Sequence, residues 1–68
     1  MKSDYDIMKI MDGTYWIECY GRIYEFIGTN GDRLLFQDVN SVDYHISIRI
    51  DKLKRDDKYE IYIKREKR

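Results

Sequence analysis

The Asn30-Gly31 pair is the feature of this sequence that most constrains how the chain can fold. It separates two runs of β-forming residues within residues 21–39, and Asn-Gly is the pair that best tolerates positive φ at both central positions of a type I′ turn. We therefore expect a β-hairpin centred on this pair. Because a hairpin turn decides which residues of its two strands lie opposite one another, it also decides the register.

Two further turn signals extend this register to a longer sheet. Gly21-Arg22 suits a type II′ turn, in which glycine comes first, and Asn40-Ser41 suits another tight turn. Together the three turns predict these opposite pairs: Cys19 with Tyr24, Ile17 with Phe26, Trp16 with Ile27, Phe26 with Leu35, Ile27 with Leu34, Leu35 with Ile46, and Phe36 with His45. A one-residue error in the register would move a strand's side chains to the opposite face.

The predicted register sorts the side chains onto two faces of the sheet. The first face is apolar and is the predicted core: Ile17, Cys19, Tyr24, Phe26, Leu35, Val39, Val42, Tyr44, Ile46, Ile48 and Ile50. The second face is mixed: Trp16, Glu18, Tyr20, Ile23, Glu25, Ile27, Leu34, Phe36, His45, Ser47 and Arg49. Contiguous exposed apolar groups mark contacts with a partner. The second face is therefore the predicted binding surface, unless the N-terminal segment folds over it.

The two ends of the chain carry their own signals. Ser3 with Asp6 three positions later is close to a capping box, and an Asp-Gly pair follows, so residues 1–13 predict one or two turns of helix. On such a helix Ile7, Met8 and Met11 cluster on one side. A strand is the alternative, because the apolar residues also alternate. Residues 59–64 predict a last strand, and residues 64–68 form a charged tail that we expect to fray.

The length of 68 residues predicts one small domain, which buries only about 60% of the surface that its unfolded chain exposes. The single cysteine, Cys19, excludes an internal disulfide, and the lone His45 adds no metal-ligand cluster, so we expect no metal and no cofactor. Oligomerisation is the remaining way to stabilise so small a domain. No apolar run reaches the roughly 20 residues of a membrane span, and no signal-peptide pattern is present, so we expect a cytoplasmic location.

The order of the predicted elements indicates an all-β domain spanning residues 1–68. Four strands in a meander, a short turn and a fifth strand are the plan of a small SH3-like barrel. The alternative is a strongly bent, open antiparallel sheet with the N-terminal helix packed on one face. The two differ in whether the strand at residues 59–64 pairs with the strand at residues 15–20 and closes the sheet.

The chain also resembles the Sm-like family. The resemblance covers most of the chain and rests on a short N-terminal helix, five bent strands, Gly21 at the end of the first strand and the apolar third strand Leu34-Leu35-Phe36-Gln37-Asp38 ending in an acid. It implies rings that bind single-stranded RNA through the loop after the second strand and an Arg-Gly-Asp-like element after the fourth. Asn30 stands in that loop without the flanking Asp and Met-Asn, and Arg49-Ile50-Asp51 has isoleucine in place of glycine.

The sequence gives little support to catalysis or to duplex-DNA binding. His45 stands on the second face with no serine or cysteine beside it and no orienting acid, and Cys19 belongs to the predicted core, so we expect no enzyme and no small-molecule substrate. The 13 basic residues balance the 13 acidic ones and the pI is about 6.6. Dedicated duplex-DNA domains more often have a pI above about 9.

Two functions remain as expectations. The first is a small binding protein of the adaptor or inhibitor type, which contacts another protein or a second copy of itself through Trp16, Glu18, Tyr20, Ile27, Leu34, Phe36 and His45. The alternative is a single-stranded RNA or DNA binder, in which exposed aromatic rings stack on bases. The phosphates would then meet the basic residues Arg49, Lys52, Lys54, Arg55 and Lys58.

Overall fold

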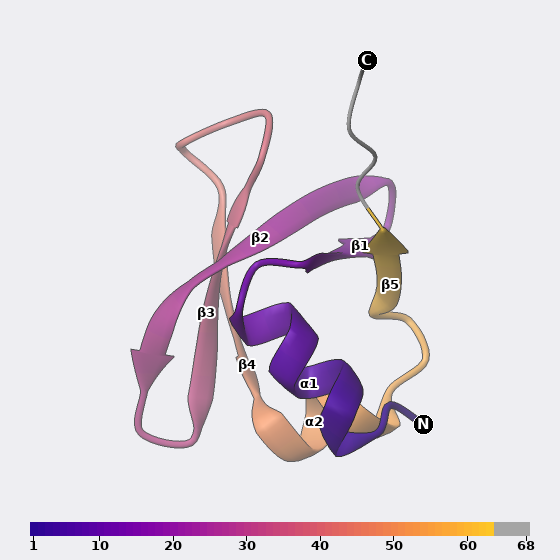
Figure 1. The fold of residues 1–68 in the computed structure, drawn as a ribbon. Helices are drawn as coiled ribbons and strands as arrows, with labels where there is room; N and C mark the ends of the chain where they lie inside the picture. Colours follow the sequence, from indigo (N-terminus) through magenta and orange to yellow (C-terminus); the bar gives the residue numbers. More distant parts are fainter. Residues whose placement is uncertain (64–68) are drawn as a thin grey trace.

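The computed structural model describes residues 1–63, and the predicted tail, residues 64–68, lies outside the described residues (Figure 1). The elements in chain order are α1 (Asp4–Met11), β1 (Tyr15–Cys19), β2 (Arg22–Asn30), β3 (Arg33–Asp38), β4 (His45–Arg49), α2 (Ile50–Arg55) and β5 (Glu60–Ile63). The strands form one antiparallel sheet in the order β4-β3-β2-β1-β5. The mainly β fold with a short N-terminal helix is therefore confirmed. No helix within residues 1–63 combines the length and apolar character needed to cross a membrane.

The sheet is bent but open. β5 pairs with β1 as expected, with Trp16 opposite Tyr62 and Ile17 opposite Ile61. The strand order nevertheless leaves β4 and β5 at opposite ends of the sheet. The structure thus has the open antiparallel sheet rather than the closed barrel, and β4 and β5 are its two edge strands.

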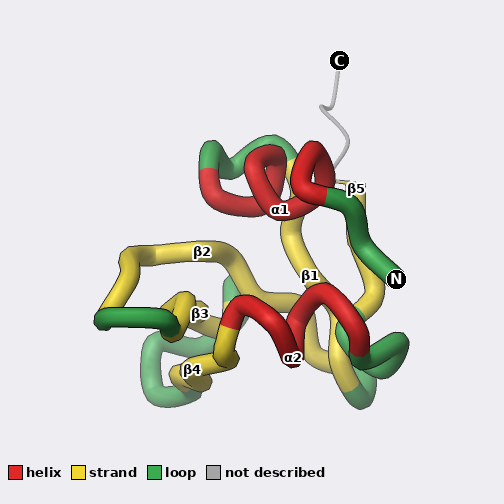
Figure 2. Tube along the Cα trace, turned by 90° about the horizontal axis from the view of Figure 1, so that it is seen from below, coloured by secondary structure: helices red, strands yellow, loops and turns green. Residues whose placement is uncertain are grey.

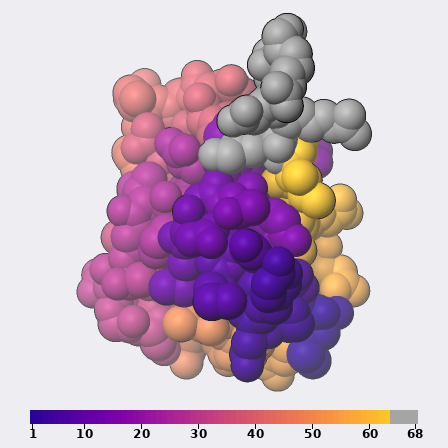
Figure 3. Space-filling view, viewed as in Figure 1, coloured from indigo at the N-terminus to yellow at the C-terminus, as the bar shows by residue number. Residues whose placement is uncertain are grey.

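The N-terminal helix forms because its caps are encoded locally. The Ser3 hydroxyl accepts from the Asp6 backbone N–H (3.1 Å), and the Asp6 carboxylate accepts from the Ser3 N–H (3.0 Å), which completes the predicted capping box. The inward-facing residues are Ile7 and Ile10. Met8 is 57% exposed, so its predicted place beside Ile7 is wrong. Figure 3 shows α1 lying across the front of the molecule, where it contacts β1 and β2.

The β1–β2 turn lies one residue earlier than predicted. Its central residues are Tyr20 (φ 53°) and Gly21 (φ 80°), and Cys19 pairs with Arg22. Two positive φ values are typical of a type I′ turn rather than the predicted type II′ turn. Ile17 consequently lies opposite Tyr24 instead of Phe26. The change in register is two residues, so the predicted faces of β1 are kept.

The β2–β3 hairpin exists, but its turn is centred on Gly31-Asp32, because Asn30 pairs with Arg33. Gly31 has φ 64°, whereas Asn30 does not have positive φ. A bulge interrupts the ladder between Phe26 and Gly28, and beyond it Phe26 lies opposite Phe36. The extra residue shifts the register by one, which turns the other face of β3 towards the core.

Because of the bulge, two predicted site residues lie on the opposite face of the sheet from the one predicted. Leu34 and Phe36, predicted on the exposed second face, are 0% exposed and lie in the core. Leu35, predicted in the core, is only partly buried. A second one-residue difference places Phe36 opposite Ile46 rather than His45. The one-residue differences in the β2–β3 and β3–β4 registers cancel in β4, so its side chains keep their predicted faces. Ile48 is buried as predicted.

The core lies between the inner face of the sheet and the two helices (Figure 2). Its buried members are Ile7, Ile10, Ile17, Cys19, Tyr24, Leu34, Phe36, Ile48, Leu53 and Tyr59. Val42 and Tyr44 were predicted there, but they lie in the connection between β3 and β4 and are 71% and 48% exposed. The tight turn predicted at Asn40-Ser41 is in fact part of this longer connection, which keeps both side chains out of the sheet.

Lys2 ties the start of the chain to α2. Its backbone N–H donates to the Lys54 carbonyl (2.8 Å), and its side-chain Nζ donates to the Leu53 carbonyl (3.0 Å). A lysine that donates to the last carbonyls of a helix complements the negative end of the helix dipole. Burial lowers the pKa of this amine despite several acidic neighbours. These hydrogen bonds connect the segment directly before α1 to the end of α2, which lies near the other end of the sequence.

Candidate binding groove along the edge of the sheet

A groove of about 430 Å³ runs along β4 on the open side of the sheet. We call it the seam groove, and its lining residues are Cys19, Tyr20, Arg22, Tyr24, Ile46, Ser47, Ile48, Lys58 and Tyr59. Successive side chains of a strand point to opposite faces, so Ile46, Ser47 and Ile48 can all reach one groove only along the edge of the strand. The seam groove therefore lies against the edge of β4 that faces away from β3.

The side of the seam groove opposite β4 is formed by residues of strands that are distant from β4 in the sheet. Cys19 ends β1 and Tyr20 follows it in the β1–β2 turn. Arg22 and Tyr24 belong to β2, and Tyr59 directly precedes β5. In the sheet, two strands lie between β4 and β1, and three lie between β4 and β5. These residues line the same groove because the sheet curls, without the two edge strands pairing.

Arg22 is held in the groove by two groups, the Asp38 carboxylate and the Tyr44 ring. Its Nη1 donates to the buried Asp38 carboxylate (2.9 Å), and its guanidinium lies over the Tyr44 ring, 3.7 Å from the centroid. The Asn40 N–H also donates to Asp38 (2.7 Å). This backbone N–H and the Arg22 guanidinium lower the pKa of Asp38, and Asp38 in turn raises the pKa of Arg22. Arg22 is thus a fixed positive charge.

Lys58 is a second cation, held between aromatic rings. Its ammonium lies 5.3 Å from the centroid of the Tyr59 ring and 5.7 Å from that of the Tyr20 ring, which is within the range of cation–π contacts. The electrostatic influence of Tyr59, and then of Tyr20, raises the pKa of Lys58. The Asp56 carboxylate is 3.9 Å away, at the outer limit of an ion pair.

Tyr20 is the most unusual residue of the seam groove. Within residues 1–63 it is the only non-glycine residue with positive φ, and its side chain is 84% exposed. The first central position of a type I′ turn favours asparagine, aspartate or glycine, because a bulky side chain is strained in the left-handed region. Strain of this kind persists most often at functional sites. Tyr20 therefore has a strained backbone conformation, and it presents its aromatic ring to solvent at the rim of the groove.

The apolar part of the groove is formed by Tyr24, Ile46 and Ile48. Burial raises the pKa of Tyr24, so its hydroxyl stays neutral throughout the physiological range. Among the described residues, the nine that line the groove include two cations and no acid. The groove is aromatic and partly apolar, and each of its two cations is paired with a carboxylate outside the lining, Arg22 with Asp38 and Lys58 with Asp56.

No family model, no curated protein and no solved structure matches this chain. The resemblance to Sm-like proteins thus stays an expectation from the sequence pattern. The function of the seam groove has to be argued from its own residues.

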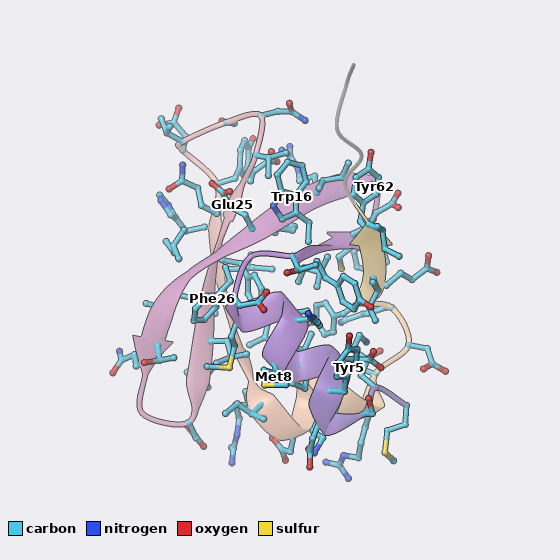
Figure 4. The ribbon with its side chains drawn as sticks, viewed as in Figure 1. Tyr5, Met8, Trp16, Glu25, Phe26 and Tyr62 are labelled. Carbon is cyan, nitrogen blue, oxygen red and sulfur yellow. The ribbon has the colours of Figure 1, made fainter. Side chains whose placement is uncertain are left out.

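The face predicted for protein binding is only partly present at the surface. With Leu34 and Phe36 in the core, its aliphatic and indole groups are reduced to Trp16, Ile23 and Ile27. Trp16 is half-buried and stacks on Tyr62 with ring centroids 6.1 Å apart and planes at 12° (Figure 4). Ile27 is the bulged residue of β2 and is 49% exposed. These groups do not form one continuous aromatic patch.

The remaining residues of the predicted face go to different places. Glu18 is half-buried and lies opposite Ile23 on one side and Glu60 on the other. His45 is exposed and lies opposite Gln37. Tyr20 alone joins the seam groove. Ile27, Phe36 and His45 of the predicted face together line a second groove of about 360 Å³ with Leu35, Ile46 and Ser47, so only the rest of that face is dispersed.

The basic residues of the alternative prediction are all engaged with carboxylates. The contacts are Arg49 with Asp32 (3.4 Å) and Asp51 (3.7 Å), Lys52 with Asp56 (3.7 Å), Lys54 with Asp4 (2.5 Å), Arg55 with Asp51 (3.4 Å) and Lys58 with Asp56 (3.9 Å). Local neutralisation weakens an electrostatic track for phosphates. In this set only Lys58 also lines the seam groove.

Most of the seam groove could not be recognised from the sequence. Tyr24, Ile46 and Ile48 were predicted as core, and Tyr24 and Ile48 are indeed buried, yet they also line the groove. The one signal available was Tyr20 directly before Gly21, an aromatic residue where a turn was expected. Within residues 1–63 no group of three or more His, Cys, Asp or Glu side chains could hold a metal ion.

Proposed function

We propose that this chain is a non-enzymatic protein-binding domain that accepts an extended segment of a partner protein in the seam groove, as an adaptor or inhibitor does. The observation that carries this proposal is the course of the groove along the edge of β4, with the exposed Tyr20 ring among its lining residues. An exposed strand edge is a template for a further strand, because its backbone N–H and C=O groups can pair with those of an extended peptide.

The sequence of β4 supports this use of its edge. Strand edges that must avoid pairing are protected by proline, by charged residues or by a bulge. β4 reads His-Ile-Ser-Ile-Arg, without proline and with its one permanent charge, Arg49, at the end. Among the described strands it pairs only with β3. The edge is thus short but open to a partner strand.

The side chains of the groove would supply specificity to such pairing. In an added strand, alternate side chains enter pockets on one face of the sheet. Ile46 and Ile48 offer an apolar surface to those side chains, and Tyr20 stands at the rim. Tyrosine is enriched at protein interfaces because it combines a large apolar ring with a hydroxyl group.

Nuclear magnetic resonance can test the proposal. A set of short extended peptides is screened by titration into the labelled protein, and amide chemical shifts are followed. We expect binding peptides to shift the signals of β4 and of the Tyr20-Gly21 turn. Shifts confined to α1, or no binding by any extended peptide, would contradict the proposal.

Two matched tyrosine variants sharpen this experiment. Tyr20→Ala removes the ring at the rim of the groove, whereas Tyr5→Ala removes a tyrosine that is 56% exposed on α1 (Figure 4). We expect peptide binding to weaken about tenfold or more in Tyr20→Ala, as for an aromatic interface anchor, and to stay unchanged in Tyr5→Ala. Equal effects of both variants would show that the groove is not the binding site.

Single-stranded nucleic acid is the second candidate, favoured by the exposed Tyr20 ring beside Lys58. An RNA oligomer is titrated under the same conditions at low and high salt. Binding that falls steeply with salt, and that is lost when Lys52, Lys54 and Arg55 are neutralised, would favour this candidate. Light scattering decides whether the free protein is a monomer or an assembly of copies.

A further inference from the structure

We infer that the seam groove selects an acidic segment, so that the partner is an extended peptide with carboxylate side chains among apolar ones. This inference rests on the proposed function, because it specifies the chemistry of the peptide that the groove accepts. Its basis is the charge of the lining residues and the way in which Arg22 and Lys58 are held.

The charge of the groove is complementary to carboxylates. Among the described residues that line it, Arg22 and Lys58 are cationic and none is acidic. A ligand with negative side chains would therefore meet a cation at two places, where the neighbouring Asp38 and Asp56 carboxylates offset part of the attraction. A basic ligand would meet like charges at the same two places.

The two cations are held differently. Arg22 donates to Asp38 through Nη1 and lies flat over Tyr44, so its position is set before any ligand binds. A guanidinium has five N–H donors, and its planar edge suits a carboxylate. The Arg22 side chain is 43% exposed, which leaves part of it open to a ligand. It can thus contact a second carboxylate without releasing the first.

Lys58 is the more available of the two cations. Its ammonium is 3.9 Å from Asp56, compared with 2.9 Å between Arg22 and Asp38. The Tyr20 and Tyr59 rings attract the ammonium without neutralising its charge. A ligand carboxylate at this place would gain a charge-assisted hydrogen bond.

Tyr20 explains how the cation and the strand edge act together. Its left-handed backbone is unfavourable for an aromatic residue, yet it places the ring beside the Lys58 ammonium, with both lining the groove. A peptide paired with β4 would have an apolar surface from Ile46 and Ile48 beneath it. The site is therefore suited to a sequence in which acidic and branched apolar residues alternate.

Three peptides of equal length test this inference by calorimetric titration and chemical-shift mapping. One alternates valine with glutamate, and the other two carry glutamine or lysine in place of glutamate. We expect the glutamate peptide to bind at least about tenfold more tightly than the glutamine peptide, since one charge-assisted hydrogen bond accounts for such a factor. The lysine peptide should be the weakest. The preference should shrink as salt rises.

Variants of the charged residues show which cation is responsible for the preference for the glutamate peptide. Lys58→Gln should lower the preference for glutamate over glutamine several-fold, whereas Arg55→Gln, which removes a cation that lies outside the groove and pairs with Asp51, should leave it unchanged. Removing Arg22 would leave the buried Asp38 without its ion partner and threatens folding, so Arg22→Lys is the second variant. It keeps the charge but loses the planar edge, and it should reduce the preference for glutamate less than Lys58→Gln does.

The outcomes separate the inference from the proposed function. If all three peptides bind equally and shift the signals of β4, the groove is a peptide site but the acidic preference is wrong. If none of them shifts β4, both are wrong. Tighter binding of an RNA oligomer to the groove, or a stable assembly of copies that covers β4 in the free protein, would also overturn the acidic-peptide occupant.

Discussion

The β1–β2 and β2–β3 turns both place residues at positive φ, but they use different residues for it. The β2–β3 turn assigns this conformation to Gly31 (φ 64°), which has no side chain to strain. The β1–β2 turn assigns it to Tyr20 (φ 53°) as well as to Gly21. The β2–β3 turn follows the residue preferences of hairpin turns, whereas the β1–β2 turn departs from them at the rim of the seam groove. The β1–β2 turn thus departs from local preference at the site for which we propose binding, whereas the β2–β3 turn does not.

The largest effect is expected where the β2–β3 hairpin meets the core. Phe36→Ala removes a side chain that is 0% exposed and packs edge-on against Phe26, with centroids 6.0 Å apart. We expect a loss of about 3–5 kcal/mol in the free energy of unfolding, enough to unfold so small a domain. Urea denaturation measures the loss. A Phe36→Ala protein of nearly normal stability would contradict the register that the bulge imposes.

The ion pair between Arg22, next to the β1–β2 turn, and the buried Asp38 predicts a loss of stability in acid. The pKa of Asp38 is lower in the folded protein than in the unfolded chain, so unfolding takes up a proton as the pH falls. The stabilising contribution is present above the ordinary aspartate pKa of about 4, and it is lost as the pH falls through the lower folded value. Urea denaturation across this range should show the loss, and Asp38→Asn should reduce its slope.

Gly31→Val tests the turn that follows the rules. A Cβ at Gly31 would contact nothing within 4 Å, so the cost is that of the positive φ alone. We expect a loss of about 1–2 kcal/mol in the free energy of unfolding. Gly28→Ala is the control, because Gly28 also has open space but does not have positive φ. Equal losses in the two variants would show that backbone conformation is not the reason for glycine at position 31.

Tyr20→Asn tests the turn that breaks the rules. Asparagine tolerates the left-handed region, so the variant should gain up to about 1 kcal/mol in the free energy of unfolding. The loss of the contact with Lys58 offsets part of this gain. Peptide binding in the seam groove should weaken at the same time. A variant that is less stable than the original, or that binds peptides equally well, would remove the argument for a functional tyrosine at this position.

The smallest effect is expected at the β1–β5 pair, away from both turns. Glu18 and Glu60 lie directly opposite one another, and like charges in this arrangement are destabilising. Glu60→Lys should raise the free energy of unfolding by about 0.2–1 kcal/mol, with the gain shrinking in high salt. Glu60→Gln removes only the repulsion between Glu18 and Glu60, whereas Glu60→Lys also adds an attraction to Glu18, so comparing the two variants separates these contributions. No change in either variant would indicate that the two side chains avoid each other.

Features set by a few neighbouring residues were predicted well. The capping box of Ser3 and Asp6 forms as expected, because both of its hydrogen bonds lie within one helical turn. The pairing of β5 with β1 was also expected, and it is present. Turn positions were wrong by one residue at Gly21 and Gly31, because glycine marks a turn without showing which of its positions it takes.

The site was predicted less well, because it depends on contacts between distant parts of the chain. Gly28, a glycine inside a strand, was the one sequence signal of the bulge that decides that Leu34 and Phe36 lie in the core. The curl of the sheet then brings Lys58 and Tyr20 to the same groove as β4. Only Tyr20 belonged to the predicted protein-binding set and only Lys58 to the predicted basic set.

The sequence by itself determined the β-rich class, the capped N-terminal helix, the number of strands and the alternation of apolar residues along them. These features depend on propensities and hydrogen bonds within a few residues. The tertiary structure alone decided which face of β3 is buried, that the sheet stays open, and that Arg22, Lys58 and Tyr20 surround the edge of β4. The reason is that register and curvature depend on the packing of the whole sheet, where one extra residue in β2 exchanges the faces of its neighbour.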